Sequence, residues 1–266
     1  MKKKLKVALA ALSLLSCKTI AQNSTPETPA IYAPTVVPKP GEMKPEMTEF
    51  WEPAVKIITP GKAISDAPSD AIVLFDGTNL AEWLVDKTGV PAAWTIKDGY
   101  MEVKPGAGDI KTKRAFSDCQ LHVEWASPEK IVGVSQGRGN SGVFLQTFYE
   151  VQVLDNYNNR TYANGQAGSL YKDTPPLVNP IRKTGEWNTY DIIFKAPRFK
   201  ADGRVDAPGE VTVLFNGVVV QANTKLLGVT QYIGVHAYPA AHGDLPIKLQ
   251  DHGNPVRFRN IWIRPM

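Results

Sequence analysis

Polar side chains that can move protons or bind metal ions recur at alternate positions in several short segments of the sequence. In an extended strand, residues two apart share a face of the sheet. In the segment 119–126 the apolar residues must face a core, so His122 and Glu124 lie together on the opposite face. The same alternation recurs in three later segments, which pair Glu150 with Gln152, Gln250 with His252, and Arg257 with Arg259. We therefore predict that these segments share one polar groove; the alternative is a plain solvated face, on which lysine, threonine and serine would be commoner.

The acidic residues of these segments bear on two kinds of chemistry. Glu124 and Glu150 could meet across strands as a pair of catalytic carboxyls. Glu150 and Asp155 are an odd number of positions apart, so a regular strand puts them on opposite faces. His122 and Glu124 could supply two ligands to a divalent metal ion. Two residues at this spacing are a weak metal signal, and a hydrogen-bonded surface histidine is the commoner situation.

A glycine-rich segment, residues 137–142, carries two more polar candidates. It precedes a predicted strand rather than a helix, unlike the loops that bind phosphate at helix N-termini. We expect it to form a tight loop at the rim of the groove that presents Arg138 and Asn140.

The first 22 residues have the pattern of an export signal. A basic start precedes an apolar run from Leu5 to Leu15, which is about half the length needed to span a bilayer. Two endings remain open: ordinary cleavage after Ala21, and a bacterial lipobox whose Cys17 would carry a lipid. We favour the lipobox because Cys17 follows the apolar run directly. We predict an exported protein, either in the periplasm or attached to the outer membrane or cell surface through that lipid.

The composition excludes several classes of protein. With 43% hydrophobic and 21% charged residues, the chain is neither disordered, collagen-like nor a polytopic membrane protein. The formal charge of +4 equals the four lysines of the first six residues, so the exported chain has no net charge to attract nucleic acid. The two cysteines are Cys17 and Cys119, and loss or modification of Cys17 leaves Cys119 without a disulfide partner.

The remaining chain divides into a leader and one domain. Residues 23–70 hold nine of the 21 prolines, which disfavour long helices and central strands; we expect a spacer over 23–45 and an ordered strap over 46–70. From residue 71 to 266 short strands dominate, with a hairpin signal at Lys97-Asp98-Gly99. Further strands are predicted at 119–126, 142–154, 188–195, 210–215, 218–222, 232–237, 246–251 and 256–263. This pattern predicts an all-β, jelly-roll β-sandwich in a single domain.

The same domain resembles a bacterial family, the domain of unknown function 1080, now described as the 3-keto-disaccharide hydrolase domain. The similarity runs in order along the domain through these segments: Leu74–Leu80 with Trp83, Leu121–Trp125, Gly139–Leu145, Tyr149–Asp155, Ala167–Tyr171, Gly185–Asn188, Phe215–Val218 and Leu249–Ile261. One departure is Gly243–Lys248, where the family more often has Gly-Pro-Ile or Gly-Pro-Leu directly before the Leu-Gln-Asp-His run.

This resemblance implies a concanavalin-like jelly roll that acts on a saccharide substrate. The implied reaction cleaves a glycosidic bond after a partner oxidoreductase has made a ketone at C3 of the sugar. That ketone acidifies the proton at C2, and removal of the proton gives an enediolate that expels the group at C1; water can add afterwards, or hydrolysis can be direct.

Residue roles follow from this chemistry. His252 is the first candidate for a base or acid, because an ordinary histidine titrates at about pH 6.5; the alternative is a structural histidine bonded within the turn at residues 251–254. Glu124 or Glu150 would be the second acid–base group. A divalent ion held by His122, Glu124 or Glu150 could polarise the ketone. The expected substrate-binding residues are Arg138, Asn140, Gln152, Tyr171, Gln250 and Arg257.

Three other functions fit the same sequence. A non-catalytic carbohydrate-binding module would use exposed aromatic side chains in the groove. A conventional glycoside hydrolase would act on an unoxidised glycan with two facing carboxylates. A structural envelope protein would pair its polar groups with one another. The fold alone does not distinguish these functions.

Overall fold

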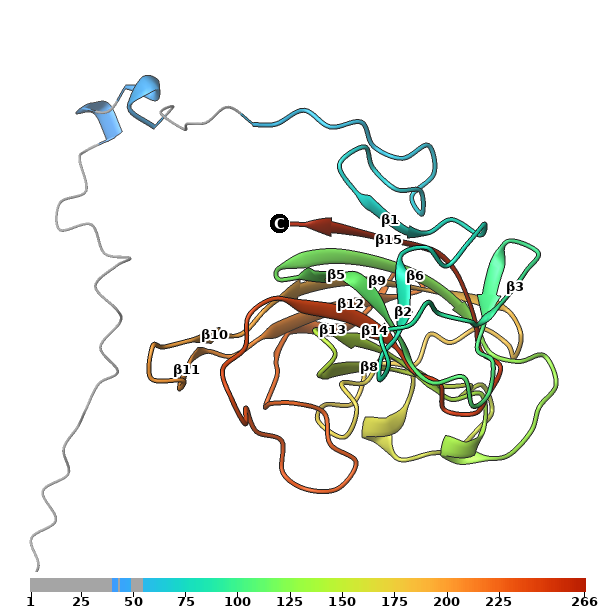
Figure 1. Cartoon of the computed structure of the whole chain (residues 1–266). Coiled ribbons are helices and arrows are strands. Elements are labelled where there is room, and N and C mark those ends of the chain that lie inside the picture. Colours follow the sequence, from blue (N-terminus) through green and yellow to red (C-terminus); the bar gives the residue numbers. More distant parts are fainter. Residues whose placement is uncertain (1–39, 43, 49–54) are drawn as a thin grey trace, which may run out of the picture. The chain divides into compact units, whose positions relative to one another are not determined.

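The computed structural model describes residues 40–42, 44–48 and 55–266 of the chain (Figure 1). The chain separates into two units at Lys56. The described part of the first unit contains two short 3-10 helices, η2 (Pro40–Glu42) and η3 (Pro45–Thr48). The predicted export signal and Cys17 lie outside the described residues. Within the described ranges, no helix is long and apolar enough to cross a membrane.

The second unit, from Ile57 onward, is a two-layer antiparallel β-sandwich of the jelly-roll type, as the sequence predicted (Figure 1). The larger sheet has eight strands in the order β13-β12-β9-β6-β15-β4-β3, with β1 paired to β15. These strands are β1 (Ile72–Phe75), β3 (Thr95–Lys97), β4 (Tyr100–Glu102), β6 (Cys119–Ala126), β9 (Trp187–Lys195), β12 (Glu210–Phe215), β13 (Val218–Lys225) and β15 (Arg257–Pro265).

The smaller sheet has five strands in the order β2-β5-β14-β7-β8. They are β2 (Trp83–Val85), β5 (Ile110–Phe116), β14 (Leu245–Leu249), β7 (Ser141–Leu145) and β8 (Tyr149–Val153). A separate ribbon pairs β10 (Arg198–Phe199) with β11 (Val205–Ala207), and two 3-10 turns, η4 (Ser135–Gly137) and η5 (Ala163–Gly165), lie in the connecting loops.

The core fills the space between the two sheets. On β6, Leu121, Val123 and Trp125 are fully buried, as the alternation predicted. Buried aromatic rings meet across the layers, with the Tyr149 and Phe194 rings 6.1 Å apart. The Tyr190 hydroxyl donates a hydrogen bond of 2.7 Å from the larger sheet to the Gln152 carbonyl oxygen of the smaller one. This bond satisfies a buried hydroxyl and fixes β8, the strand that carries Glu150, against β9.

Several strand predictions are confirmed and two are wrong. The β3–β4 hairpin turns at Asp98 and Gly99, both with positive φ, as a two-residue type I′ turn requires. The predicted strand 142–154 is instead the β7–β8 hairpin, because Gln146 and Thr147 adopt left-handed φ values between the strands. The predicted strand 232–237 is a loop, despite its run of apolar side chains.

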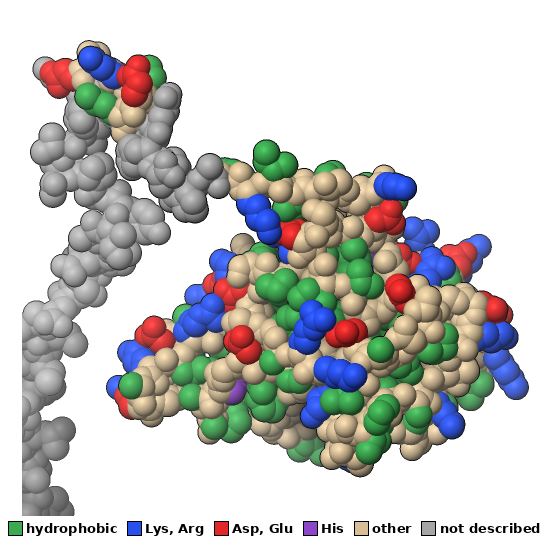
Figure 2. Space-filling view, turned by 45° about the horizontal axis from the view of Figure 1, so that its top comes forward, with side chains coloured by type: hydrophobic (Ala, Val, Ile, Leu, Met, Phe, Trp, Pro, Cys, Tyr) green, Lys and Arg blue, Asp and Glu red, His purple; other side chains and the backbone are tan. Residues whose placement is uncertain are grey.

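Residues 57–70 contact the outer face of the larger sheet. The Ser65 carbonyl oxygen accepts hydrogen bonds of 2.9 Å from Asn260 Nδ2 and 2.8 Å from Trp262 Nε1. Asp70 accepts a third, of 2.7 Å, from Arg264 Nε. The predicted strap over residues 46–56 stays a prediction. Figure 2 shows acidic and basic side chains intermixed over the visible face of the domain.

Candidate active site

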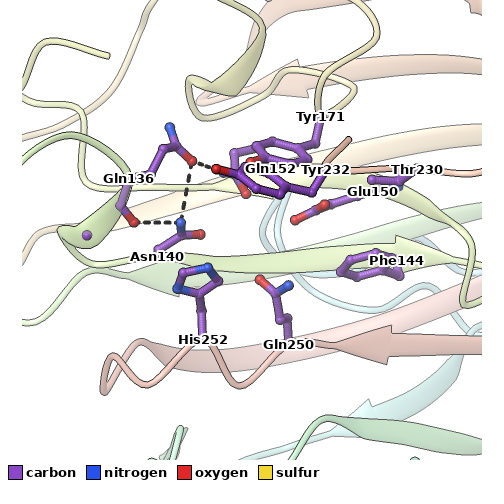
Figure 3. Close-up of a pocket in the computed structure, with 11 residues that line it drawn as sticks. Gln136, Asn140, Phe144, Glu150, Gln152, Tyr171, Thr230, Tyr232, Gln250 and His252 are labelled. Carbon is purple, nitrogen blue, oxygen red and sulfur yellow. Dashed lines mark hydrogen bonds between the residues drawn. The ribbon is translucent and has the colours of Figure 1, made fainter. Parts of the chain in front are cut away.

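A pocket of about 490 Å³ lies on the smaller sheet, on the face away from the core (Figure 3). Strands β7 and β8 and the polypeptide following β14 contribute its floor, and three loops contribute its walls. It is lined by Gln136, Gly137, Asn140, Phe144, Glu150, Gln152, Tyr171, Thr230, Tyr232, Gln250 and His252. Six of these residues were predicted from the sequence: Asn140, Glu150, Gln152, Tyr171, Gln250 and His252.

Glu150 is the carboxylic acid of this pocket. Glu150 is 5% exposed, and its carboxyl group makes no hydrogen bond to any residue in the described part of the chain. Burial raises its pKa from 4.5 to about 8; the nearby Lys248 charge lowers the pKa in part, and Asp109 raises it. Glu150 therefore holds its proton at neutral pH and can donate that proton to a bound molecule.

The sheet register explains which groups act on Glu150. Lys248 of β14 pairs with Phe144 of β7, and Phe144 pairs with Glu150 of β8, so the three side chains form one row across the sheet. Lys248 Nζ lies 4.0 Å from the Phe144 ring centroid and 3.5 Å from Asp109 Oδ2. The Phe144 ring thus occupies the position between the ammonium group and the glutamic acid.

Gly142 makes room for the Glu150 carboxyl. A side chain at this position of β7 would collide with Glu150 Oε1 and with the Phe144 ring, which would lie 2.8 Å from the added carbon. A glycine inside a strand often marks such a close approach. The absence of a side chain at Gly142 is therefore a feature of the site.

Four amide side chains form a polar layer in the same pocket as Glu150. Gln136 Oε1 accepts a hydrogen bond of 2.9 Å from Gln152 Nε2, and the Gln136 carbonyl oxygen accepts one of 2.7 Å from Asn140 Nδ2 (Figure 3). The side-chain oxygens of Asn140, Gln152 and Gln250 are buried and have no partner among the described residues. Buried acceptors are rarely left unpaired, so this layer is suited to a ligand that presents several hydroxyl donors.

His252 stands at the opposite wall from Glu150. It is exposed, and its ring makes no hydrogen bond to a described residue. In the turn at 251–254 the backbone N–H of Gly253 donates to Asp251 instead. Figure 3 places the imidazole and the Gln250 amide on one side of the pocket, across from Glu150, Thr230 and the two tyrosines. The imidazole is therefore accessible to a molecule bound in the pocket.

Two predicted residues, His122 and Glu124, lie elsewhere. They project from β6 on the outer face of the larger sheet, whereas Glu150 projects from the smaller sheet. The prediction of one shared groove is corrected, because alternation gives the face of a strand but not the sheet that the strand joins. Glu124 and Glu150 therefore do not form a catalytic pair.

A closed network holds His122 and Glu124. His122 Nδ1 lies 2.7 Å from Asp191 Oδ1, and Arg259 Nε donates a hydrogen bond of 2.6 Å to Glu124 Oε2. Burial acts to lower the pKa of His122, but the hydrogen bonds to Asp191 and Glu124 prevail and raise it to about 9. Burial likewise acts to raise the pKa of Glu124, but its hydrogen bonds prevail and lower it to about 2.

The predicted metal-binding set of His122, Glu124 and Glu150 is therefore not brought together. Glu124 instead accepts hydrogen bonds from Arg259 and Asn260. In the described ranges, no group of three or more histidine, cysteine, aspartate or glutamate side chains could hold a metal ion.

Two predicted substrate-binding arginines are also outside the pocket lining. Arg138 is 8% exposed, and its Nε donates a hydrogen bond of 2.8 Å to Asp155 Oδ2, so Asp155 anchors this arginine. Arg257 lies on the outer face of the larger sheet, 5.6 Å from the Trp187 ring centroid and 3.1 Å from Glu129 Oε1. Both guanidinium groups are thus engaged in the scaffold.

Sequence reasoning missed five lining residues. Phe144 shares the face of Gly142 and Glu150, so the alternation of β7 and the hairpin register could have revealed it. Gly137 begins the loop that was predicted at the rim, and Gln136 precedes that loop by one residue. Thr230 and Tyr232 come from an irregular loop, and the apolar pattern there indicated a strand instead.

Comparisons with known proteins agree with the fold. The family described as the 3-keto-alpha-glucoside-1,2-lyase-like domain matches residues 70–264. A 3-keto-disaccharide hydrolase of Bacteroides thetaiotaomicron is 29% identical over 246 residues, which cover 74% of this chain and 80% of that protein.

Solved structures give the same picture. A crystal structure of a protein from Parabacteroides distasonis, provisionally described as a glycosyl hydrolase, is 52% identical with a TM-score of 0.80, and the match covers 84% of this chain and 97% of that one. A second protein of that organism with the same description is 20% identical with a TM-score of 0.54, over 74% of this chain and 94% of its own. The second likeness concerns the fold alone.

Proposed function

Because the chain belongs to the 3-keto-alpha-glucoside-1,2-lyase-like domain family, we propose that its pocket cleaves the glycosidic bond of a sugar that carries a ketone at C3. The protein is a carbohydrate-active, glycosyl hydrolase-like protein; the keto substrate and the mechanism are the proposal. A single observation supports it most strongly: a buried glutamic acid that keeps its proton at neutral pH shares the pocket with three unpartnered amide oxygens and lies across from an unengaged histidine.

The first step is removal of the C2 proton. The C3 ketone acidifies this proton, and His252 takes it as a general base. The C2–H bonding electrons move into a C2–C3 double bond, and the negative charge passes to the C3 oxygen. The Gln250 amide, whose nitrogen makes no hydrogen bond to a described residue, can donate to that oxygen.

The second step expels the leaving group. The electrons return from the C3 oxygen and re-form the ketone, a C1–C2 double bond forms, and the C1–O bond breaks. Glu150 gives its proton to the departing oxygen, so the leaving group departs as a neutral alcohol. Addition of water at C1 then gives the free 3-keto sugar. The ketone must be made beforehand, so the proposal includes a partner oxidoreductase that supplies the substrate.

The test uses an α-linked disaccharide of glucose, its 3-keto derivative, and the purified protein. We expect release of the second sugar from the keto compound only. Release from the unoxidised disaccharide would indicate a conventional glycosidase instead. Saturable binding without release from either compound would indicate a carbohydrate-binding module.

Deuterium exchange separates the two catalytic roles. In D₂O, the Glu150→Gln variant should still exchange the C2 proton of the keto disaccharide while release of the second sugar falls about 100-fold or more. His252→Gln should lose exchange and release together. Exchange that survives in His252→Gln would contradict the assignment of the base.

A further inference from the structure

The pocket has two chemically different parts. One part is lined by amides and Glu150, and the other by the rings of Tyr171 and Tyr232 (Figure 3). Tyr232 is 70% exposed, more than any other large aromatic residue in the described ranges. An aromatic ring that is mostly exposed contributes little to folding, and a ring that lines a pocket is available to a ligand.

The Tyr232 ring is held in place from one side. Lys172 Nζ lies 5.3 Å from the Tyr232 ring centroid and 4.1 Å from that of Tyr162. The hydroxyls of Tyr162 and Tyr171 lie 2.6 Å apart. Lys172 has a φ of 62°, a left-handed conformation that is unfavourable for a lysine. The ammonium group therefore links the hydrogen-bonded pair of Tyr162 and Tyr171 to the exposed Tyr232.

The loop that carries Tyr232 is attached to the catalytic strand. The Glu150 backbone N–H donates a hydrogen bond of 2.9 Å to Thr230 Oγ1, and the Thr230 N–H donates one of 2.9 Å to the Phe148 carbonyl oxygen. The Leu227 N–H donates a hydrogen bond of 3.1 Å to Asp173, the residue after Lys172. Thr230, two residues before Tyr232, thus contacts the backbone of the proposed acid directly.

The side of the pocket on which Tyr232 lies indicates what it binds. Figure 3 places Tyr171, Tyr232 and Thr230 at the wall of Glu150, and His252 at the opposite wall. An acid that protonates the departing oxygen must lie beside the leaving group. The group attached to that oxygen therefore extends along the tyrosine wall.

We propose that Tyr232, supported by Lys172 and Tyr171, forms a leaving-group subsite that stacks on a second sugar ring. This inference rests on the proposed function, because the position of Glu150 as the acid defines the side of the pocket on which the leaving group lies. It goes beyond that function in naming the residue that makes the enzyme prefer a ring-shaped leaving group over a small alcohol. The apolar face of a pyranose is suited to such a ring, and stacking of this kind tolerates many sugars.

The kinetic test compares a 3-keto disaccharide with methyl 3-keto-α-glucoside. The ratio of their kcat/KM values should fall about tenfold in Tyr232→Ala and stay within about twofold of wild type in Tyr232→Phe, which keeps the ring. Val235→Ala changes an exposed residue of the same loop that does not line the pocket, and should leave the ratio unchanged. An unchanged ratio in Tyr232→Ala would overturn the subsite.

A binding test does not depend on turnover. In the Glu150→Gln background, Tyr232→Ala should weaken calorimetric binding of the keto disaccharide about tenfold more than binding of the methyl glycoside. Equal weakening of both ligands would overturn the inference even if the wild type cleaves the substrate. Absence of cleavage with selective loss of disaccharide binding would refute the proposed reaction and support the subsite.

Discussion

Glu150 is the residue on which the acid–base argument depends, because its environment favours the protonated form. The pKa of about 8 arises chiefly from burial, with Asp109 and Lys248 acting in opposite directions. Lys248 Nζ and Asp109 Oδ2 lie 3.5 Å apart. Their balance determines the pH at which the acid is lost.

This balance predicts the alkaline side of the pH profile. Activity should fall as pH rises past about 8, because Glu150 then loses the proton that it must donate. Lys248→Met removes a positive charge and should move the fall to higher pH, whereas Asp109→Asn should move it to lower pH. The measurement is kcat/KM between pH 6 and 10 for all three proteins. Shifts in the same direction for both variants would contradict the assignment.

The same residue predicts a pH-dependent difference in stability. Between its ordinary pKa of 4.5 and about 8, the folded protein holds a proton that the unfolded chain releases. The free energy of unfolding must therefore decrease as pH rises through this range. Glu150→Gln removes this dependence, so the variant should match wild type near pH 5 and be more stable at pH 8, on the order of a few kcal/mol. The measurement is urea unfolding of both proteins at the two pH values. If the difference in unfolding free energy between variant and wild type is the same at both, Glu150 is not protonated in the folded protein.

At the scale of elements, the β7–β8 hairpin positions the acid. Gly142 and Glu150 lie in neighbouring rows of two paired strands, and the carboxyl occupies the space that a side chain at Gly142 would fill. The atoms that would collide belong to the ends of movable side chains rather than to the backbone. The site is therefore more sensitive to this position than the fold is.

Gly142→Ala should lower activity with little effect on folding. The added methyl group displaces the Glu150 carboxyl, and a displacement of this size costs about 10- to 100-fold in kcat/KM. Thermal unfolding should change by only a few degrees. Full activity in Gly142→Ala would show that the acid does not need this space.

The elements also show how far the sequence could predict the site. Alternation correctly placed Leu121 in the core and Glu150 on a polar face, because both depend on neighbours one or two residues away. It could not assign β6 and β8 to different sheets, since strand order depends on pairing between β6, β9 and β15 far along the chain. Tyr232 was missed because an irregular loop has no periodic signal.

At the scale of the whole molecule, the jelly-roll fold followed from many short strands and from the ordered family motifs. The two faces of the sandwich differ in a way that the sequence did not reveal. On the larger sheet His122, Glu124 and Asp191 satisfy one another, and residues 57–70 contact that face. On the smaller sheet the polar groups remain available to a ligand.

Export remains a prediction for the whole chain. If Cys17 carries a lipid, the wild-type protein should be found in the membrane fraction, and Cys17→Ser should move nearly all of it to the soluble fraction. The intact mass of the wild-type protein gives the second measurement, since a mature chain that begins at Gln22 would contradict the lipobox. The other cysteine, Cys119, is not a competing site for modification, because burial raises the pKa of its thiol to about 12.

The unpartnered oxygens of Asn140, Gln152 and Gln250 have a consequence for selectivity. An unsatisfied buried acceptor costs about 1–3 kcal/mol, so a ligand that brings O–H donors to these oxygens is favoured over one that does not. A deoxy sugar leaves one oxygen without its donor, and sites built to bind a hydroxyl reject such analogues by about four orders of magnitude. Deoxygenation at a single carbon would therefore identify which hydroxyl each amide receives.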